Sequence, residues 1–388
     1  MQTPFEIGKY QIVKKIATGG MAEIYLAIQR SIEGFERTVV IKRLHDYRMN
    51  DDEFITMFLD EARLVAKLSH PNIAQLYDIG FDGDSYYLVI EYIKGVNLAD
   101  IIDNYNGALP YEFSIPVIYG VCEALNYIHN LTDEYGNPLN VVHRDVNPQN
   151  VLISYTGAVK LIDFGIAKAK THVYETRTGI IKGTYGYMAP EQITKKIPIG
   201  PYTDLFAVGI MLYEMTTGYH PFNAQTEMEI FKKILNAHYV KPSQIIKDYP
   251  KELESLIVQL LSINPVDRPL SAFEIQEVLE QFMFKRGIFY STSRIAKVLS
   301  KIIKGESVEG KNYLISSNKF ISEKLDAKAK TKDSSYEDLE TVIIRGSKRK
   351  RERRSKYLIL IGIVIFLSIL ILAYFFSWLF NSYLFSSD

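Results

Sequence analysis

The 388-residue chain has one cysteine, one tryptophan and no net charge. A single cysteine excludes an internal disulfide framework and is compatible with a reducing cytoplasm. Because 45 Lys and Arg balance 45 Asp and Glu, no overall field would attract nucleic acid or another strongly charged partner. Cys122 lies among apolar residues of a predicted helix, which favours a buried core thiol over a reactive one. The N-terminus lacks an apolar secretory core, so no signal peptide is expected.

Charged residues are absent from Tyr357–Phe380, a run rich in Ile, Leu and Phe. About 20 apolar residues in a helix cross a bilayer core, so this run predicts one transmembrane helix rather than a buried soluble helix. The preceding segment, residues 345–356, is strongly basic and contains Glu352 as its only acidic residue. Its position beside the apolar run favours a membrane flank over a nucleic-acid patch.

Basic flanks stay on the cytoplasmic side of a membrane. We therefore expect single-pass anchoring in the cell (inner) membrane, with the catalytic part in the cytoplasm and a short tail, residues 381–388, outside. The helix and its basic flank would both contact membrane lipid.

Hydrophobic periodicity divides the remaining chain into a small sheet-rich lobe and a larger helical lobe, which is an α+β organisation. The expected strands are 10–17, 24–29, 38–44 and 86–91, and the expected helices are 54–68, 113–130, 204–217, 227–236, 252–262 and 272–284. The lobes cover about residues 1–93 and 94–284 of a domain at 1–284. Residues 285–356 are polar without a sustained period, which predicts a linker of low order with room for one short helix at 293–303.

Four motifs follow one another along the chain. They are VVIKRL around Lys42, HRDVNPQN at His143–Asn150, DFG at Asp163–Gly165, and GTYGYMAPE at Gly183–Glu191. Phosphoryl transfer from ATP needs a carboxylate near the attacking hydroxyl and oxygen ligands for Mg²⁺. Asp145 is suited to the first task, and Asn150 and Asp163 are suited to the second.

On these motifs the chain resembles the eukaryotic-like (Hanks-type) protein kinases, specifically their bacterial serine/threonine branch, over about residues 8–283. The resemblance implies a bilobal protein kinase fold. It implies transfer of the ATP γ-phosphate to Ser or Thr hydroxyls of proteins, including the chain itself, in membrane-associated signalling. It also implies ATP and two Mg²⁺ ions, for which Mn²⁺ could substitute, and a second copy of the chain as a partner in trans-phosphorylation. Nucleic acid is not expected as a partner.

The turn IATGGMAEI has only part of the family's glycine pattern. Ala17 and Ala22 replace the outer glycines, while Gly19 keeps the middle one with Gly20 beside it. Glycine lets backbone amides approach phosphate, so the replacements bear on nucleotide affinity. The nucleotide-binding residues that the resemblance implies are Ile16, Ala17, Thr18, Gly19, Gly20, Met21, Ala22, Glu23, Ile24, Lys42, Glu91 and Ile93.

Glu61 falls on the apolar stripe of the helix at 54–68. A carboxylate on a buried face is costly unless it is paired, and Lys42 on the neighbouring strand is the natural partner. The resemblance implies the same pair, with Lys42 holding the α- and β-phosphates.

The resemblance implies further roles around the activation segment. Thr171, Thr176 and Thr178 are candidate phosphorylation sites, and Arg144 would pair with a phosphorylated residue there. Scaffold roles are implied for three more positions: Thr184 contacting Asp145, Glu191 pairing with Arg268, and Asp204 bracing the backbone of the catalytic loop.

Asn147 stands where serine/threonine members usually have lysine. Asparagine brings no positive charge to the transferring phosphate, so we expect some loss of rate and a weaker case for Ser/Thr over Tyr. Asn147→Lys is expected to keep or raise activity. Pro148 keeps the serine/threonine form of the loop.

Three other readings compete with an active protein kinase. Ala17, Ala22 and Asn147 favour a pseudokinase, which the retained Lys42 and Asp145 oppose. The APE-like motif argues against a small-molecule kinase of the same fold. A receptor with an external sensor is disfavoured because the tail after Phe380 is short.

Overall fold

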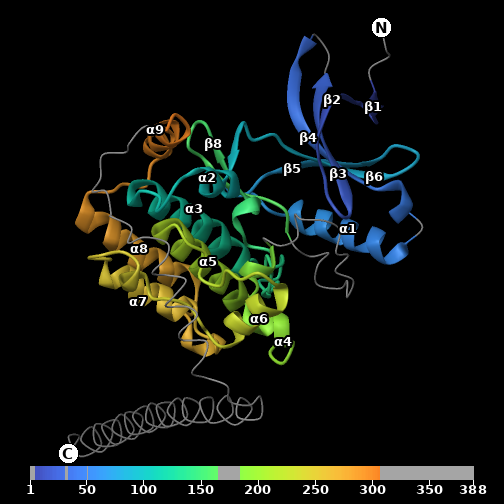
Figure 1. Cartoon of the computed structure of the whole chain (residues 1–388). Coiled ribbons are helices and arrows are strands. Elements are labelled where there is room, and N and C mark those ends of the chain that lie inside the picture. Colours follow the sequence, from blue (N-terminus) through green and yellow to red (C-terminus); the bar gives the residue numbers. More distant parts are fainter. Residues whose placement is uncertain (1–4, 31–33, 50, 165–183, 306–388) are drawn as a thin grey trace, which may run out of the picture. The chain divides into compact units, whose positions relative to one another are not determined.

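The computed structural model describes residues 5–30, 34–49, 51–164 and 184–305. In this part of the chain an antiparallel sheet with one long helix comes first, and a larger helical lobe follows (Figure 1). Both lobes belong to one compact unit. The expected α+β arrangement of two lobes is therefore confirmed.

Six strands form the sheet of the small lobe in the order β1-β2-β3-β4-β6-β5, with antiparallel neighbours throughout. The strands are β1 (Glu6–Ile7), β2 (Tyr10–Thr18), β3 (Ala22–Arg30), β4 (Glu36–Leu44), β5 (Leu76–Phe81) and β6 (Tyr86–Glu91). On β4, Val39 and Ile41 are fully buried in one apolar cluster, whereas Leu44 packs with Phe58 of α1 on the opposite face. Side chains alternate along a strand, so Lys42 points to the α1 side together with Leu44.

Helix α1 (Asp52–Val65) begins at a carboxylate cap, because Asp51 accepts hydrogen bonds from the backbone N–H groups of Glu53 and Phe54. A short turn, η2 (Asp46–Arg48), precedes it. The buried face of α1 contains Met57, Phe58, Glu61 and Ala62. The periodicity thus brings one carboxylate into the core beside Lys42.

The second lobe combines helices with a three-stranded sheet in the order β7-β8-β9. Its strands are β7 (Gly95–Asn97), β8 (Val151–Ser154) and β9 (Val159–Leu161). Its α-helices are α2 (Leu98–Asn104), α3 (Tyr111–His129), α4 (Pro190–Thr194), α5 (Pro201–Thr217), α6 (Glu227–Leu235), α7 (Lys251–Leu260), α8 (Ala272–Arg286) and α9 (Thr292–Ile303). Short 3₁₀ turns are η3 (Pro148–Asn150), η5 (Thr184–Tyr187), η6 (Pro242–Gln244) and η7 (Pro265–Asp267).

Helices α3 and α5 form the centre of this lobe. Helix α5 is apolar on nearly all sides and buried along most of its length, as expected for a helix surrounded by others. It ends at Gly218, whose φ of 77° is the left-handed conformation that favours glycine. Cys122 in α3 is fully buried, and burial raises the pKa of its thiol.

Helical structure continues past residue 284, and the short helix expected at 293–303 is present as α9. Helix α8 continues to Arg286, and α9 packs on the large lobe through Ile295, Leu299 and Ile302. These three residues are spaced i, i+4 and i+7, which is one face of a helix. The first part of the expected low-order linker, residues 285–305, is therefore ordered structure.

No helix within the described ranges is long and apolar enough to cross a bilayer. The expected span at Tyr357–Phe380, its basic flank and the tail 381–388 lie outside the described residues.

The packing of α9 makes a specific demand on the β8–β9 turn. Gly157 in this turn has φ +87°, and a β-carbon there would lie 1.8 Å from the carbonyl oxygen of Thr292 in α9. Gly83, in the β5–β6 turn, has φ +100° and nothing within 4 Å of its would-be β-carbon. We expect Gly83→Ala to cost only the backbone strain, about 1–2 kcal/mol. Gly157→Ala should cost that strain plus about 1–3 kcal/mol for displacing α9.

Urea unfolding of both variants measures the difference. Amide exchange within α9 should quicken in the Gly157 variant alone. Equal costs in the two variants would show that α9 does not depend on this contact.

Candidate active site

The loop carrying Asp145 is fixed by Asp204, a buried residue of α5. Its Oδ2 accepts from the backbone N–H of His143, and its Oδ1 accepts from the N–H of Arg144, both at 2.8 Å. His129 Nε2 lies 2.8 Å from Oδ2. Arg144 has φ +68°, an uncommon conformation for a residue with a side chain. Asp204 therefore occupies the bracing position that the resemblance implied.

His143 supports Asp145 through a neutral ring. Burial lowers the pKa of His143. Its Nδ1 accepts from the Asp145 N–H at 3.3 Å, so Nε2 carries the proton that reaches the Ile162 carbonyl at 3.1 Å. The ring also contacts Phe164, which is 3% exposed, with ring centroids 4.7 Å apart. This imidazole therefore connects the catalytic loop to the segment before and after Asp163.

Two asparagine amides hold the Asp145 carboxylate. Asn150 Nδ2 donates to the backbone oxygen and to Oδ2 of Asp145, both at 2.8 Å. Asn147 Nδ2 donates to the backbone oxygen at 3.0 Å and to Oδ1 at 3.1 Å. The sequence motif indicated Asn150, but the contact from Asn147 was not expected.

Asp163 is placed beside this turn by the strand pairing. Val151 of β8 lies opposite Leu161 of β9, and the Ile162 N–H donates to the Asn150 carbonyl at 2.9 Å. Asp163 then has φ +51°. The turn after β9 thus brings Asp163 next to Asn150, while Gly165 lies outside the described residues.

Lys42 joins three elements through one ammonium group. Its Nζ lies 3.0 Å from Glu61 Oε1 on α1 and 2.9 Å from Asp163 Oδ1. Burial disfavours the charge on Lys42, but Asp163 and Glu61 outweigh burial and raise its pKa. Burial also raises the pKa of Glu61, and Lys42 opposes that shift. The lysine is therefore protonated at neutral pH, and the expected Lys42–Glu61 pair is present.

The turn between β2 and β3 is held by two residues that the sequence did not indicate. His45 Nε2 lies 2.8 Å from the Gly19 carbonyl, and the Tyr47 hydroxyl donates to the Gly20 carbonyl at 3.2 Å. The two rings stack with centroids 5.0 Å apart. A β-carbon at Gly20 would meet no atom within 4 Å, so no neighbouring group crowds this side of the turn.

The other implied nucleotide-binding residues line the same turn and the connector after β6. Ile16, Ala17 and Thr18 end β2, Met21 follows the glycines, and Ala22, Glu23 and Ile24 begin β3. The Glu91 side chain pairs with Lys160 at 2.9 Å, and its N–H donates to the Gln75 carbonyl. Ile93 follows two residues later.

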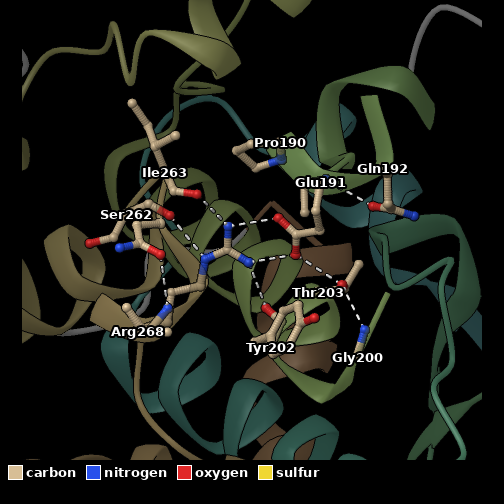
Figure 2. Close-up of polar contacts among 12 residues, drawn as sticks. Pro190, Glu191, Gln192, Gly200, Tyr202, Thr203, Ser262, Ile263 and Arg268 are labelled. Atoms are coloured by element: carbon tan, nitrogen blue, oxygen red, sulfur yellow. Dashed lines mark hydrogen bonds and ion pairs between the residues drawn. The ribbon is translucent and has the colours of Figure 1, made fainter. Parts of the chain in front are cut away.

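Glu191 and Arg268 form a bidentate pair in the large lobe (Figure 2). The two N···O distances are 2.7 and 2.9 Å, and both side chains are completely buried. The guanidinium also donates to the carbonyls of Tyr202, Ser262 and Ile263, as Figure 2 shows. Every part of this buried charge is therefore compensated, and the pair joins α4 to the loop before α8.

Several expected residues fall outside this description. Thr171, Thr176 and Thr178 lie in the stretch 165–183, and the side chain of Thr184 is likewise not described. Arg144 Nε is buried and has no hydrogen-bond partner within the described ranges.

The residues present fit ATP and Mg²⁺. No group of three or more His, Cys, Asp or Glu side chains in the described part could hold a metal by itself. Mg²⁺ in phosphotransferases is held by one or two side chains together with phosphate oxygens, so this is no obstacle. Asp163 supplies a carboxylate that is 42% exposed, and the amide nitrogen of Asn150 faces Asp145, which leaves its oxygen as the ligand atom.

This arrangement defines a phosphotransferase of the bilobal kinase type. The structure of the Mycobacterium tuberculosis PknI kinase domain has the same fold, with a TM-score of 0.53 at 23% identity, and the match covers 72% of this chain and 98% of that one. A profile of the protein kinase domain matches residues 10–283. The chain belongs to the protein kinase domain family.

Curated relatives carry kinase names of both specificities. Tyrosine-protein kinase MasK of Myxococcus xanthus is 41% identical over 71% of this chain. Probable serine/threonine-protein kinase CPE1738 of Clostridium perfringens is 36% identical over 70%, and serine/threonine-protein kinase PrkC of Bacillus subtilis is 34% identical over 69%. The matches cover only 43%, 38% and 40% of those three proteins.

The buried Glu191–Arg268 pair allows a sharp stability test. Arg268→Met leaves the Glu191 carboxylate uncompensated in the core, and we expect a loss of about 3–5 kcal/mol in unfolding free energy. Arg30→Met breaks the Arg30–Glu36 pair, whose side chains are 63% and 50% exposed, and should cost less than about 1 kcal/mol.

Chemical denaturation of both variants gives the comparison. A loss for Arg268→Met no larger than that for Arg30→Met would mean that the buried pair is not a structural support.

Proposed function

We propose that this chain is a membrane-anchored serine/threonine protein kinase that transfers the ATP γ-phosphate to protein hydroxyls, including its own. The observation that carries the proposal is the convergence of Asp145, Asn150, Asp163 and the Lys42–Glu61 pair on one site. Protein kinases need these groups together: a carboxylate for the hydroxyl, oxygen ligands for Mg²⁺, and a lysine for phosphate.

The residues of the chain have distinct tasks in this reaction. Asp145, held by two amides, orients the acceptor hydroxyl and receives its proton. Lys42 stays charged through its carboxylate partners and can hold the α- and β-phosphates. Asp163 and Asn150 would hold two magnesium ions, and Mg²⁺ supplies neutralisation of charge on the β- and γ-phosphates when bound. Positioning and charge stabilisation therefore account for most of the catalysis.

Serine and threonine are the proposed acceptors, because Pro148 keeps the serine/threonine form of the loop and two of the relatives described above are named for that specificity. The name of MasK makes tyrosine the second candidate. Phosphoamino-acid analysis of the products distinguishes the two outcomes directly.

Autophosphorylation at Thr176 or Thr178 is the proposed means of activation, with Thr171 as a further site. The support is the buried Nε of Arg144, which has no partner in the described part of the chain. A guanidinium in that situation is suited to a phosphate group. Trans-phosphorylation between two copies on one membrane would follow from their raised local concentration.

Replacing the catalytic carboxylate tests the reaction. Asp145→Asn removes the proton acceptor, so we expect transfer of label from ATP to fall by about 10²–10⁴-fold while ATP binding remains close to normal. Asp84→Asn, in the exposed β5–β6 turn, is the matched control and should retain activity.

Mass spectrometry of the products should locate phosphate on Thr176 or Thr178 in the wild type alone. Near-normal transfer by Asp145→Asn would refute the catalytic assignment. A wild type that binds ATP without transferring label would make the chain a pseudokinase scaffold.

Membrane attachment is proposed from the sequence, with the kinase domain in the cytoplasm and the C-terminus outside. Deleting Tyr357–Phe380 removes about 20 apolar residues, enough to cross a bilayer, so the protein should move from the membrane fraction to the soluble fraction. Deleting residues 306–329, which are not apolar throughout, is a control of similar length and should leave the distribution unchanged. Retention of the Tyr357–Phe380 deletion on membranes would assign binding to the basic flank or to a partner.

A further inference from the structure

Asn147 uses its whole amide group within the catalytic loop. The residue is 3% exposed. Its Nδ2 donates to the backbone oxygen and to Oδ1 of Asp145, at 3.0 and 3.1 Å. Its Oδ1 accepts from the Gln149 N–H at 2.9 Å and so caps the turn η3. Asn147 therefore makes three defined hydrogen bonds of its own and is more than a position from which lysine is missing.

The Asp145 carboxylate is consequently held on both oxygens. Asn147 donates to Oδ1, and Asn150 donates to Oδ2 at 2.8 Å. Both amides belong to the same short turn, whose first residue, Pro148, restricts the backbone. Carboxylate and turn thus form one hydrogen-bonded unit.

We propose that Asn147 is a positioning residue for phosphoryl transfer, which fixes the rotation of the Asp145 carboxylate before substrate binds. The inference rests on the proposed kinase function. A carboxylate held in its working orientation need not be ordered at the moment of reaction, and misplacement of a reacting group by about 1 Å can cost about 10²-fold in rate. In this chain the fixed orientation of the Asp145 carboxylate offsets part of the rate that is lost with the positive charge of lysine.

Lysine at this position cannot reproduce the arrangement. Its side chain has no acceptor for the Gln149 N–H, and its ammonium would have to be accommodated at a site that is 3% exposed. We therefore expect Asn147→Lys to lower activity, contrary to the expectation from the sequence alone.

A simple capping role is the alternative that the test must separate. Capping uses only the acceptor Oδ1, whereas positioning uses the donor Nδ2. Aspartate keeps the acceptor that caps the turn, but when ionised it cannot donate and it adds a negative charge beside Asp145. Asn147→Asp therefore removes the donor and adds like-charge repulsion, whereas Asn147→Ala removes the donor without adding charge. The chain offers a matched control in a second Asn-Pro turn: Asn264 caps η7 by accepting from the Val266 N–H at 3.4 Å, in the loop between α7 and α8.

The experiment measures steady-state transfer from radiolabelled ATP to casein by the full-length chain in mild detergent. For Asn147→Asp we expect kcat to fall about 10–100-fold, as misorientation of a reacting group predicts. The KM for ATP should stay within about twofold, because Lys42 and Asp163 are unchanged. Asn264→Asp should match the wild type in both constants. Asn147→Ala, which loses cap and donor, should lower kcat at least as much and also lower the melting temperature.

A kcat for Asn147→Asp equal to that of the wild type would overturn the inference and leave Asn147 as a cap. A loss of ATP affinity in parallel with kcat would also overturn it, because general damage to the site would then explain the change. If the wild type itself transfers no label to casein or to itself, the proposed kinase function fails, and this inference fails with it.

Discussion

The buried carboxylate of Asp204 is the group on which the geometry of the active site depends. The segment between Val141 and Asn147 belongs to neither helix nor strand, and two of its backbone N–H groups are bound by this carboxylate. An unpaired charge in the core would be costly, but Asp204 accepts from two backbone donors and lies beside His129. Because α5 is packed inside the helical lobe, the loop carrying Asp145 takes its rigidity from that core.

The small lobe is connected to the same site by the ammonium of Lys42. It contacts the Glu61 carboxylate on α1 and the Asp163 carboxylate on the segment after β9. The interactions of this one side chain of β4 therefore depend on the positions of both segments. Its low exposure weakens solvent screening and makes each contact stronger than a surface ion pair would be. A displacement of α1 therefore changes the electrostatic environment of Asp163 through Lys42.

Local periodicity and motif spacing were sufficient to predict the two lobes, the long helices and the Lys42–Glu61 pair. The pair was predictable because a carboxylate on an apolar stripe needs a partner. His45 and Tyr47 could not be found in this way, since they bond to carbonyls 26 and 27 residues away along the chain and no local pattern marks such contacts. The motif showed only that lysine is missing at Asn147, because its hydrogen bonds depend on the shape of the turn. The short helix expected at 293–303 is present as α9, but its packing on the large lobe through Ile295, Leu299 and Ile302 was not predicted, because the basic residues between them gave the segment the composition of a linker.

Cys122 has a consequence for the chemistry that can reach this enzyme. It is the only thiol of the chain, it is fully buried in α3, and burial raises its pKa, so it stays protonated and shielded at neutral pH. Oxidants and electrophiles react with exposed thiolates. The folded protein therefore offers no cysteine through which peroxide could modulate it, and a single cysteine introduced at the surface would be the one position that a maleimide probe labels.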